Sequence, residues 1–148
     1  MNHSYAVCPS CDGLNRFDVD LALSKTPICG KCKTDLPFHR GVVTVSASQL
    51  SVLTKKSPLP VIVDFWAPWC GPCKTFAPTF ESAAIGLKAQ LVFAKLNTEA
   101  HPLAGDVYSI RSIPTLTLFR NGREIARQSG AMPAEMLNRW IHQNLGAA

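Results

Sequence analysis

All six cysteines of this 148-residue chain occur in pairs with two residues between the partners. Two of the three pairs, Cys8 with Cys11 and Cys29 with Cys32, lie in the first 40 residues, where large apolar side chains are scattered. A segment of about 40 residues rarely stays folded without a metal, disulfides or a partner. The cysteines therefore predict that residues 1–40 form a small N-terminal unit held together at its sulfur atoms.

The spacing of these four cysteines favours a metal. Seventeen residues separate Cys11 from Cys29, which fits the spacing of about 15–20 residues in four-cysteine zinc sites. In a reducing compartment, such cysteines are more often metal ligands than structural disulfides. Four thiolates close the coordination shell, which indicates a structural ion. We predict one structural zinc in a zinc-ribbon-like knuckle, with two disulfides or free thiols as the alternative; the ligands would be Cys8, Cys11, Cys29 and Cys32.

From Gly41 onward, apolar runs alternate with helix-like segments, a pattern typical of an α/β domain with a partly parallel sheet. The Asn121-Gly122 dipeptide predicts a β-hairpin, and Pro78 a helix kink. Residues 41–148 are therefore expected to form the second domain. Strands are predicted over Val42–Val45, Val61–Phe65, Leu91–Leu96, Thr115–Phe119 and Glu124–Gln128, and helices over Ala47–Lys55, Cys70–Lys88, Pro102–Tyr108 and Pro133–Leu145.

Charge and hydropathy exclude several function classes. The net charge is +5, and up to Arg40 five basic residues stand against four acidic ones, so the dense basic face that binds a phosphate backbone is absent. The N-terminus lacks the basic flank and apolar core of a secretory signal. Leu59–Trp69 is shorter than the roughly 20 apolar residues of a membrane span. We predict a cytoplasmic protein without nucleic-acid or membrane partners, and we expect a monomer.

The third cysteine pair has the sequence context of a redox dithiol. Trp69-Cys70-Gly71-Pro72-Cys73 follows an apolar strand and opens a predicted helix. Free N–H groups and the helix dipole at that end favour a thiolate at Cys70. Cys73 lies one turn further, close enough for a disulfide and less exposed. Cys70 is thus the candidate nucleophile and Cys73 the resolving thiol. A structural zinc half-site is the alternative, but it would need a second ligand pair nearby.

These motifs together resemble the thioredoxin family: Val63-Asp64-Phe65-Trp66-Ala67, then Trp69-Cys70-Gly71-Pro72-Cys73, and Ile113-Pro114-Thr115 downstream. The resemblance covers about Val42 to Leu145. It implies a thioredoxin fold, with a central mixed sheet flanked by helices, and reduction of disulfide-containing client proteins by dithiol–disulfide exchange. It also implies recycling by an NADPH-dependent thioredoxin reductase, and no bound organic cofactor. The N-terminal cysteines are similar to those of the longer, zinc-containing second thioredoxins of bacteria (thioredoxin 2 type).

The resemblance also assigns roles around the dithiol. A carboxylate within the apolar strand, as at Asp64, needs a raised pKa or a partner. In the family the matching Asp helps to move the proton of the second cysteine and has a lysine neighbour, here Lys95; a surface ion pair is the alternative. Pro114 matches a cis proline, and the Ile113 backbone pairs with substrate. The implied client surface comprises Trp69, Gly71, Pro72, Ile113, Pro114, Gly130 and Ala131.

Two other functions remain open at this point. An oxidase or isomerase would share the fold and differ in redox poise, although Gly71-Pro72 resembles the dipeptide of reducing thioredoxins. A zinc-dependent, redox-switched binding module or holdase would instead use the N-terminal segment to grip partners. Trp66 and Trp140 are expected to be packing residues. His3 and His39 are expected to be surface residues.

Overall fold

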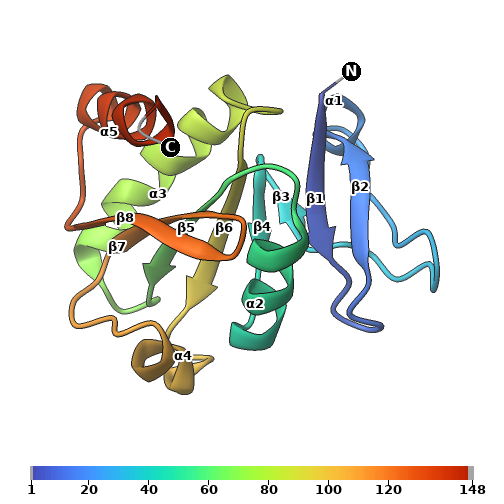
Figure 1. Ribbon diagram of the computed structural model, residues 1–148, viewed down its shortest axis with the longest axis horizontal. Helices are drawn as coiled ribbons and strands as arrows, with labels where there is room; N and C mark the ends of the chain where they lie inside the picture. The colour runs from blue at the N-terminus through green and yellow to red at the C-terminus, as the bar shows by residue number, and fades with distance from the viewer. Residues whose placement is uncertain (1, 147–148) are drawn as a thin grey trace.

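A six-stranded mixed sheet organises most of the chain in the computed structural model, which describes residues 2–146 (Figure 1). Its strand order is β3-β4-β6-β5-β7-β8, in which β4, β6 and β5 run parallel while β3, β7 and β8 run antiparallel to their neighbours. The strands are β3 (Phe38–His39), β4 (Val42–Thr44), β5 (Val61–Trp66), β6 (Val92–Asn97), β7 (Thr115–Arg120) and β8 (Arg123–Ser129).

Helices cover both faces of this sheet. They are α2 (Ala47–Lys56), α3 (Gly71–Gly86), α4 (Pro102–Val107) and α5 (Ala134–Gly146). Figure 1 shows α3 and α5 on one side of the sheet and α2 and α4 on the other. The central strand β5 is buried on both faces: Val63 packs in one cluster with Leu53 of α2, and Ile62 packs in another with Phe80 of α3. Its apolar run, which only Asp64 interrupts, follows from this double burial.

The predicted elements of residues 41–148 are all present, with ends shifted by one or two residues. Cys70 precedes α3 as its N-cap residue and is not part of the helix. Asn121 and Gly122 have φ values of 54° and 79°, which are the left-handed conformations that a tight hairpin turn needs. In α5, Leu137 and Ile141 are buried. Met136, on the same helix, is 49% exposed.

The N-terminal segment forms a hairpin of β1 (His3–Val7) and β2 (Leu14–Asp18), followed by the short α1 (Val19–Ala22). The spacing of the cysteines did not predict these elements. The hairpin lies beside α2 in Figure 1, and Val7 shares one buried cluster with Leu50 of α2. The Phe17 and Phe38 rings meet edge to face with their centroids 4.8 Å apart. The segment therefore completes its core by packing against the remainder of the chain.

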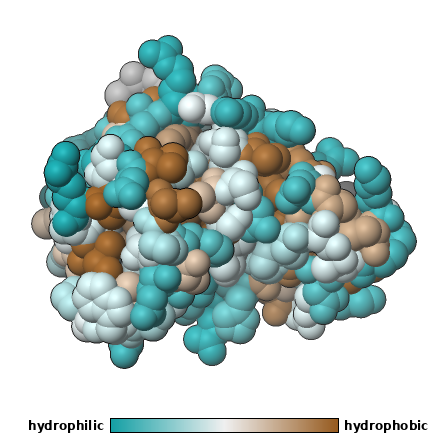
Figure 2. Space-filling model, turned by 90° about the horizontal axis from the view of Figure 1, so that it is seen from below, coloured by the Kyte–Doolittle hydropathy of each residue, from teal (hydrophilic) through white to brown (hydrophobic). Residues whose placement is uncertain are grey.

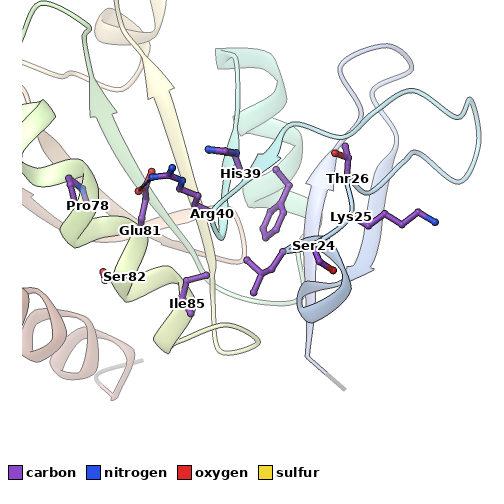
Figure 3. Close-up of a pocket in the computed structure, with 12 residues that line it drawn as sticks. Ser24, Lys25, Thr26, His39, Arg40, Pro78, Glu81, Ser82 and Ile85 are labelled. Atoms are coloured by element: carbon purple, nitrogen blue, oxygen red, sulfur yellow. Dashed lines mark ion pairs between the residues drawn. The ribbon is translucent and has the colours of Figure 1, made fainter.

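Two ion pairs also link this segment to the α3 side of the sheet, Asp20 with Lys88 and Arg40 with Glu81. Arg40 and Glu81 also line an open hollow of about 600 Å³. In Figure 3 the Arg40 side chain points toward Glu81 of α3, whereas the Lys25 side chain points away from the hollow. Of the helices within residues 2–146, none combines the length and apolarity that crossing a membrane requires.

Candidate functional site

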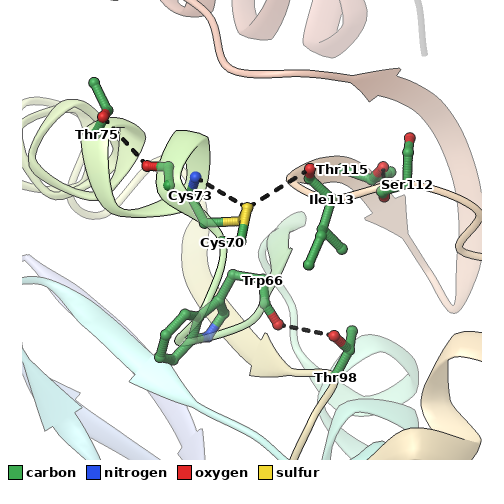
Figure 4. Close-up of a disulfide and its surroundings, with 9 residues drawn as sticks. Trp66, Cys70, Cys73, Thr75, Thr98, Ser112, Ile113 and Thr115 are labelled. Carbon is green, nitrogen blue, oxygen red and sulfur yellow. Dashed lines mark hydrogen bonds between the residues drawn. A yellow bond between two sulfur atoms is a disulfide. The ribbon is translucent and has the colours of Figure 1, made fainter.

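Cys70 and Cys73 form a disulfide at the N-terminus of α3 (Figure 4). The backbone N–H of Cys73 donates to the Cys70 sulfur at 3.2 Å, and Pro72 occupies the first helical turn, where an N–H is dispensable. The Cys70 sulfur also lies 3.8 Å from the carbonyl oxygen of Ile113. Cys70 and Cys73 are both nearly buried, at 4% and 2% exposed. The loop before β7 thus faces the dithiol directly.

Asp64 and Lys95 are neighbours in the parallel pair of β5 and β6. Because side chains alternate along a strand, Asp64 shares the face of Ile62, which is the face covered by α3. The residue is 4% exposed, and its Oδ1 atom has no hydrogen-bond partner among the described residues. Burial raises the pKa of the Asp64 carboxyl to about 7, although the positive charge of Lys95 opposes this shift.

Lys95 and Trp66 also meet on this side of the sheet. The Lys95 ammonium lies 5.6 Å from the centre of the Trp66 ring, within the range of a cation–π contact. Trp66 itself is half-buried and packs against the cluster that contains both cysteines. Thr98 donates to the Trp66 carbonyl oxygen through both its N–H, at 2.8 Å, and its hydroxyl, at 3.0 Å. These bonds hold the end of β6 against the loop that leads to Cys70.

A groove of about 540 Å³ opens beside the disulfide. It is lined by Trp69, Cys70, Gly71, Pro72 and Ile113, all predicted from sequence, and by Thr98, Gly105, Ile110, Arg111 and Ser112, which sequence reasoning did not identify. Figure 2, which views the end of the molecule that carries α4, shows hydrophobic side chains gathered among polar ones. No pattern within the sequence pointed to the five additional residues, because only the fold brings Thr98, Gly105 of α4 and residues 110–112 together beside the dithiol.

The remaining predicted surface residues adjoin the groove through the backbone. The Ile113-Pro114 peptide bond is cis, and Pro114 is buried. The Gly130 N–H donates to the Pro114 carbonyl oxygen at 2.8 Å. Gly130 adopts a φ of 94°, which favours glycine. Gly130 and Ala131 are exposed, and neither is among the described residues that line the groove.

The four N-terminal cysteines converge at a second site. Their sulfur atoms all lie within 4.8 Å of one another. The closest contacts join the two C-x-x-C pairs, at 3.5 Å between Cys8 and Cys32 and 3.7 Å between Cys11 and Cys29. Sulfurs bound to one tetrahedral zinc at about 2.3 Å lie roughly 3.8 Å apart. The cluster is therefore compatible with zinc, and it includes neither His3 nor His39 among the described ligand atoms.

Backbone N–H groups support negative charge on these sulfurs. The N–H of Ser10 donates to Cys8 and that of Lys31 to Cys29, both at 3.4 Å. Hydrogen bonds from the backbone of Cys32 and Lys31 lower the pKa of Cys29 to about 6. A metal site needs deprotonated thiols, and such bonds favour the thiolate form. The 29–32 loop thus has the chemistry of a metal-binding turn, whereas in the other loop, against a backbone hydrogen bond from Gly13, burial and the neighbouring cysteines raise the pKa of Cys11 to about 11.

A disulfide capping a helix beside an open groove is the arrangement of a thiol–disulfide oxidoreductase. The sequence model of the thioredoxin family, described as "Thioredoxin", matches residues 41–143, which is more than half of the chain. The chain therefore belongs to the thioredoxin family, and the fold predicted from its motifs is confirmed. Thioredoxins are protein disulfide reductases, so the chain is an enzyme of that class.

Individual relatives of this chain are also named thioredoxins. "Thioredoxin C-3" of Corynebacterium nephridii is 40% identical over 140 residues, which cover 94% of each chain. "Thioredoxin 1" of Nostoc sp. is 40% identical over 103 residues, covering 70% of this chain and 94% of its own. "Thioredoxin" of Haemophilus influenzae is 35% identical over 104 residues, covering 70% and 97%. The first match covers 140 of the 148 residues, so it must include most of the N-terminal cysteine segment.

Proposed function

We propose that this protein reduces disulfides in client proteins, with Cys70 as the nucleophile and Cys73 as the resolving thiol. The observation that carries the proposal is the position of Cys70, which caps α3 and lines an open groove. In the reduced enzyme, the Cys70 thiolate attacks one client sulfur and expels the other as a thiolate. Cys73 then attacks the Cys70 sulfur and releases the second client thiol. The client gains two electrons, and the enzyme ends in the disulfide form.

Local electrostatics support this division of roles. The Cys73 N–H, which lies 3.2 Å from the Cys70 sulfur, and the end of the α3 dipole both stabilise a thiolate at Cys70. Cys73 must lose its proton before it attacks. Asp64 lies on the sheet face beneath α3, and with a pKa of about 7 its carboxylate is suited to accept that proton near neutral pH. Lys95 stabilises the ionised form of Asp64.

The groove supports binding of an extended client segment. Its wall of Trp69, Gly71, Pro72 and Ile113 is mostly apolar and built from small or rigid residues, which suits clients of varied sequence. The Ile113 carbonyl, close to the Cys70 sulfur, is positioned to accept a hydrogen bond from client backbone. Pro114, Gly130 and Ala131 would hold and extend this wall. We infer that an NADPH-dependent thioredoxin reductase returns the enzyme disulfide to the dithiol.

For the second site we propose a single structural zinc ion. Cys8, Cys11, Cys29 and Cys32 would hold it, and the ion would tie the loop after β1 to the 29–35 loop. Four thiolates persist in a reducing compartment, which supports the cytoplasm as the place of action. A zinc-dependent binding module is a second candidate, since Leu21 and Ile28 of this segment are 67% and 53% exposed and line an apolar hollow.

Trapping tests the reductase proposal. A Cys73→Ser variant should accumulate a mixed disulfide with a client at Cys70, whereas Cys70→Ser should form none. The wild type should also reduce insulin with NADPH and thioredoxin reductase. A Cys73→Ser protein without an adduct at Cys70 would contradict the assigned roles.

The other two proposals have tests of their own. Less than half an equivalent of zinc in protein purified under reducing conditions would contradict the metal site. Full biological activity of the double variant Cys70→Ser, Cys73→Ser would favour the binding module.

A further inference from the structure

The groove beside the dithiol carries one permanent charge. Of its ten lining residues, Arg111 alone is a lysine, arginine, aspartate or glutamate. The other nine are apolar residues, glycines, hydroxyl residues and Cys70 itself. Arg111 lies two residues before Ile113, whose carbonyl oxygen is 3.8 Å from the Cys70 sulfur. A client segment that reaches Cys70 through this groove therefore passes Arg111.

No carboxylate within the described part of the chain neutralises this guanidinium. The three ion pairs among residues 2–146 use the basic residues Arg40, Lys88 and Arg127, and Arg111 belongs to none of them. Two acidic residues on the adjacent elements, Glu99 and Asp106, are exposed and do not line the groove. Arg111 is itself exposed. Its charge is thus available to a group that the client supplies.

We propose that Arg111 is a specificity-determining residue that favours client disulfides flanked by an acidic side chain. The inference rests on the proposed function, because it concerns the clients of the Cys70 thiolate. A guanidinium recognises a carboxylate through two parallel N–H···O bonds. The apolar wall of the groove excludes part of the solvent when a client docks, which strengthens the attraction over that in bulk water. The same guanidinium would repel a basic flanking residue.

The expected magnitude is modest. Ion pairs at exposed positions contribute about 0.2–1 kcal/mol, which corresponds to roughly a 1.5- to 5-fold change in a rate or binding constant. Since the pair forms as the client docks, the change should fall on the second-order rate constant for client reduction. It should weaken in about 0.5 M salt, because exposed charges are screened over a few ångströms there.

Three peptides with one intramolecular disulfide each would test the proposal. The residues on both sides of the cysteines would be Glu in the first, Gln in the second and Lys in the third. Single-turnover reduction by pre-reduced full-length protein gives the second-order rate constant without any reductase. The variants are Arg111→Gln and, as the matched control, Lys74→Gln, which removes an exposed charge next to Cys73 and outside the groove lining.

Each peptide is compared across the protein variants, because flanking charge also alters the reactivity of the peptide's own sulfurs. We expect Arg111→Gln to slow reduction of the Glu peptide about 2- to 5-fold, to leave the Gln peptide nearly unchanged and to speed the Lys peptide. Lys74→Gln should change the three rates nearly alike. If Arg111→Gln changed the rate constant by the same factor for all three peptides, the inference would be overturned. Failure of the wild type to reduce any peptide would instead overturn the proposed function, and the inference with it.

Discussion

Replacing Asp64 by asparagine should stabilise the protein, and the gain should grow with pH. Burial raises the pKa of this carboxyl from its ordinary value of 3.8 to about 7. The native protein therefore keeps the Asp64 proton at pH values where the unfolded chain has lost it. Stability is highest below the unfolded pKa and is lost as the pH rises through the folded pKa. The free energy of unfolding falls by about 1.36 kcal/mol per pH unit from pH 5 until the pH reaches the folded pKa of about 7, and it then levels off. The loss between pH 5 and pH 8 is therefore about 2.7 kcal/mol.

Asparagine has nearly the same shape as aspartate and does not ionise. The free energy of unfolding of Asp64→Asn should therefore rise relative to that of the wild type by about 2.7 kcal/mol between pH 5 and pH 8. For a chain of this length, the gain corresponds to roughly 5–10 °C in Tm. Urea unfolding of the disulfide form at both pH values measures it. The exposed Asp106 offers the control, since Asp106→Asn should show little pH-dependent gain. If the difference in free energy of unfolding between Asp64→Asn and wild type were the same at pH 5 and pH 8 within about 0.5 kcal/mol, the assignment of a buried carboxyl with a raised pKa would be refuted.

Three further outcomes test the scaffold around the site. Ser46→Ala removes the hydroxyl that accepts from the Gln49 N–H, which is one half of the capping box at the start of α2, and should lower the free energy of unfolding by about 1 kcal/mol in urea titrations. Phe17→Ala removes the half-buried ring that packs on the buried ring of Phe38; it should lower the free energy of unfolding by roughly 2 kcal/mol, and a loss below about 0.5 kcal/mol would show that the hairpin is not held by this contact. Chelating the metal should increase amide hydrogen exchange in residues 29–35 far more than in β5, and equal exchange with and without chelator would contradict a structural ion.

The dithiol and the elements of residues 41–148 were predictable because their determinants are local. A buried central strand has an apolar run, the helix that follows Cys70 has Pro72 in its first turn, and the hairpin has Asn121-Gly122. Each pattern acts within a few residues, so its structural consequence follows from the sequence itself. The limits of this approach appear at the ends of elements, where Cys70 proves to be a cap.

The features that sequence could not supply depend on distant segments. Thr98, Arg111 and Ser112 reach the groove from two different connections, and nothing in their local sequence marks them. The hairpin β1–β2 was hidden because its buried residues, such as Val7, complete their packing with distant residues such as Leu50 of α2. For Asp64, sequence indicated an unfavourable carboxylate. Only the fold supplies the burial that sets its pKa.

The position of the N-terminal segment bears on how the two cysteine sites relate. This segment packs against α2 and contributes β3, a two-residue strand that covers the edge of β4. A covered edge is protected from pairing with other chains. The groove beside Cys70, by contrast, is lined entirely by residues between Trp69 and Ile113. Loss of the proposed zinc ion should therefore act on disulfide reduction through the stability of the scaffold, with the geometry of the dithiol preserved for as long as the sheet stays folded.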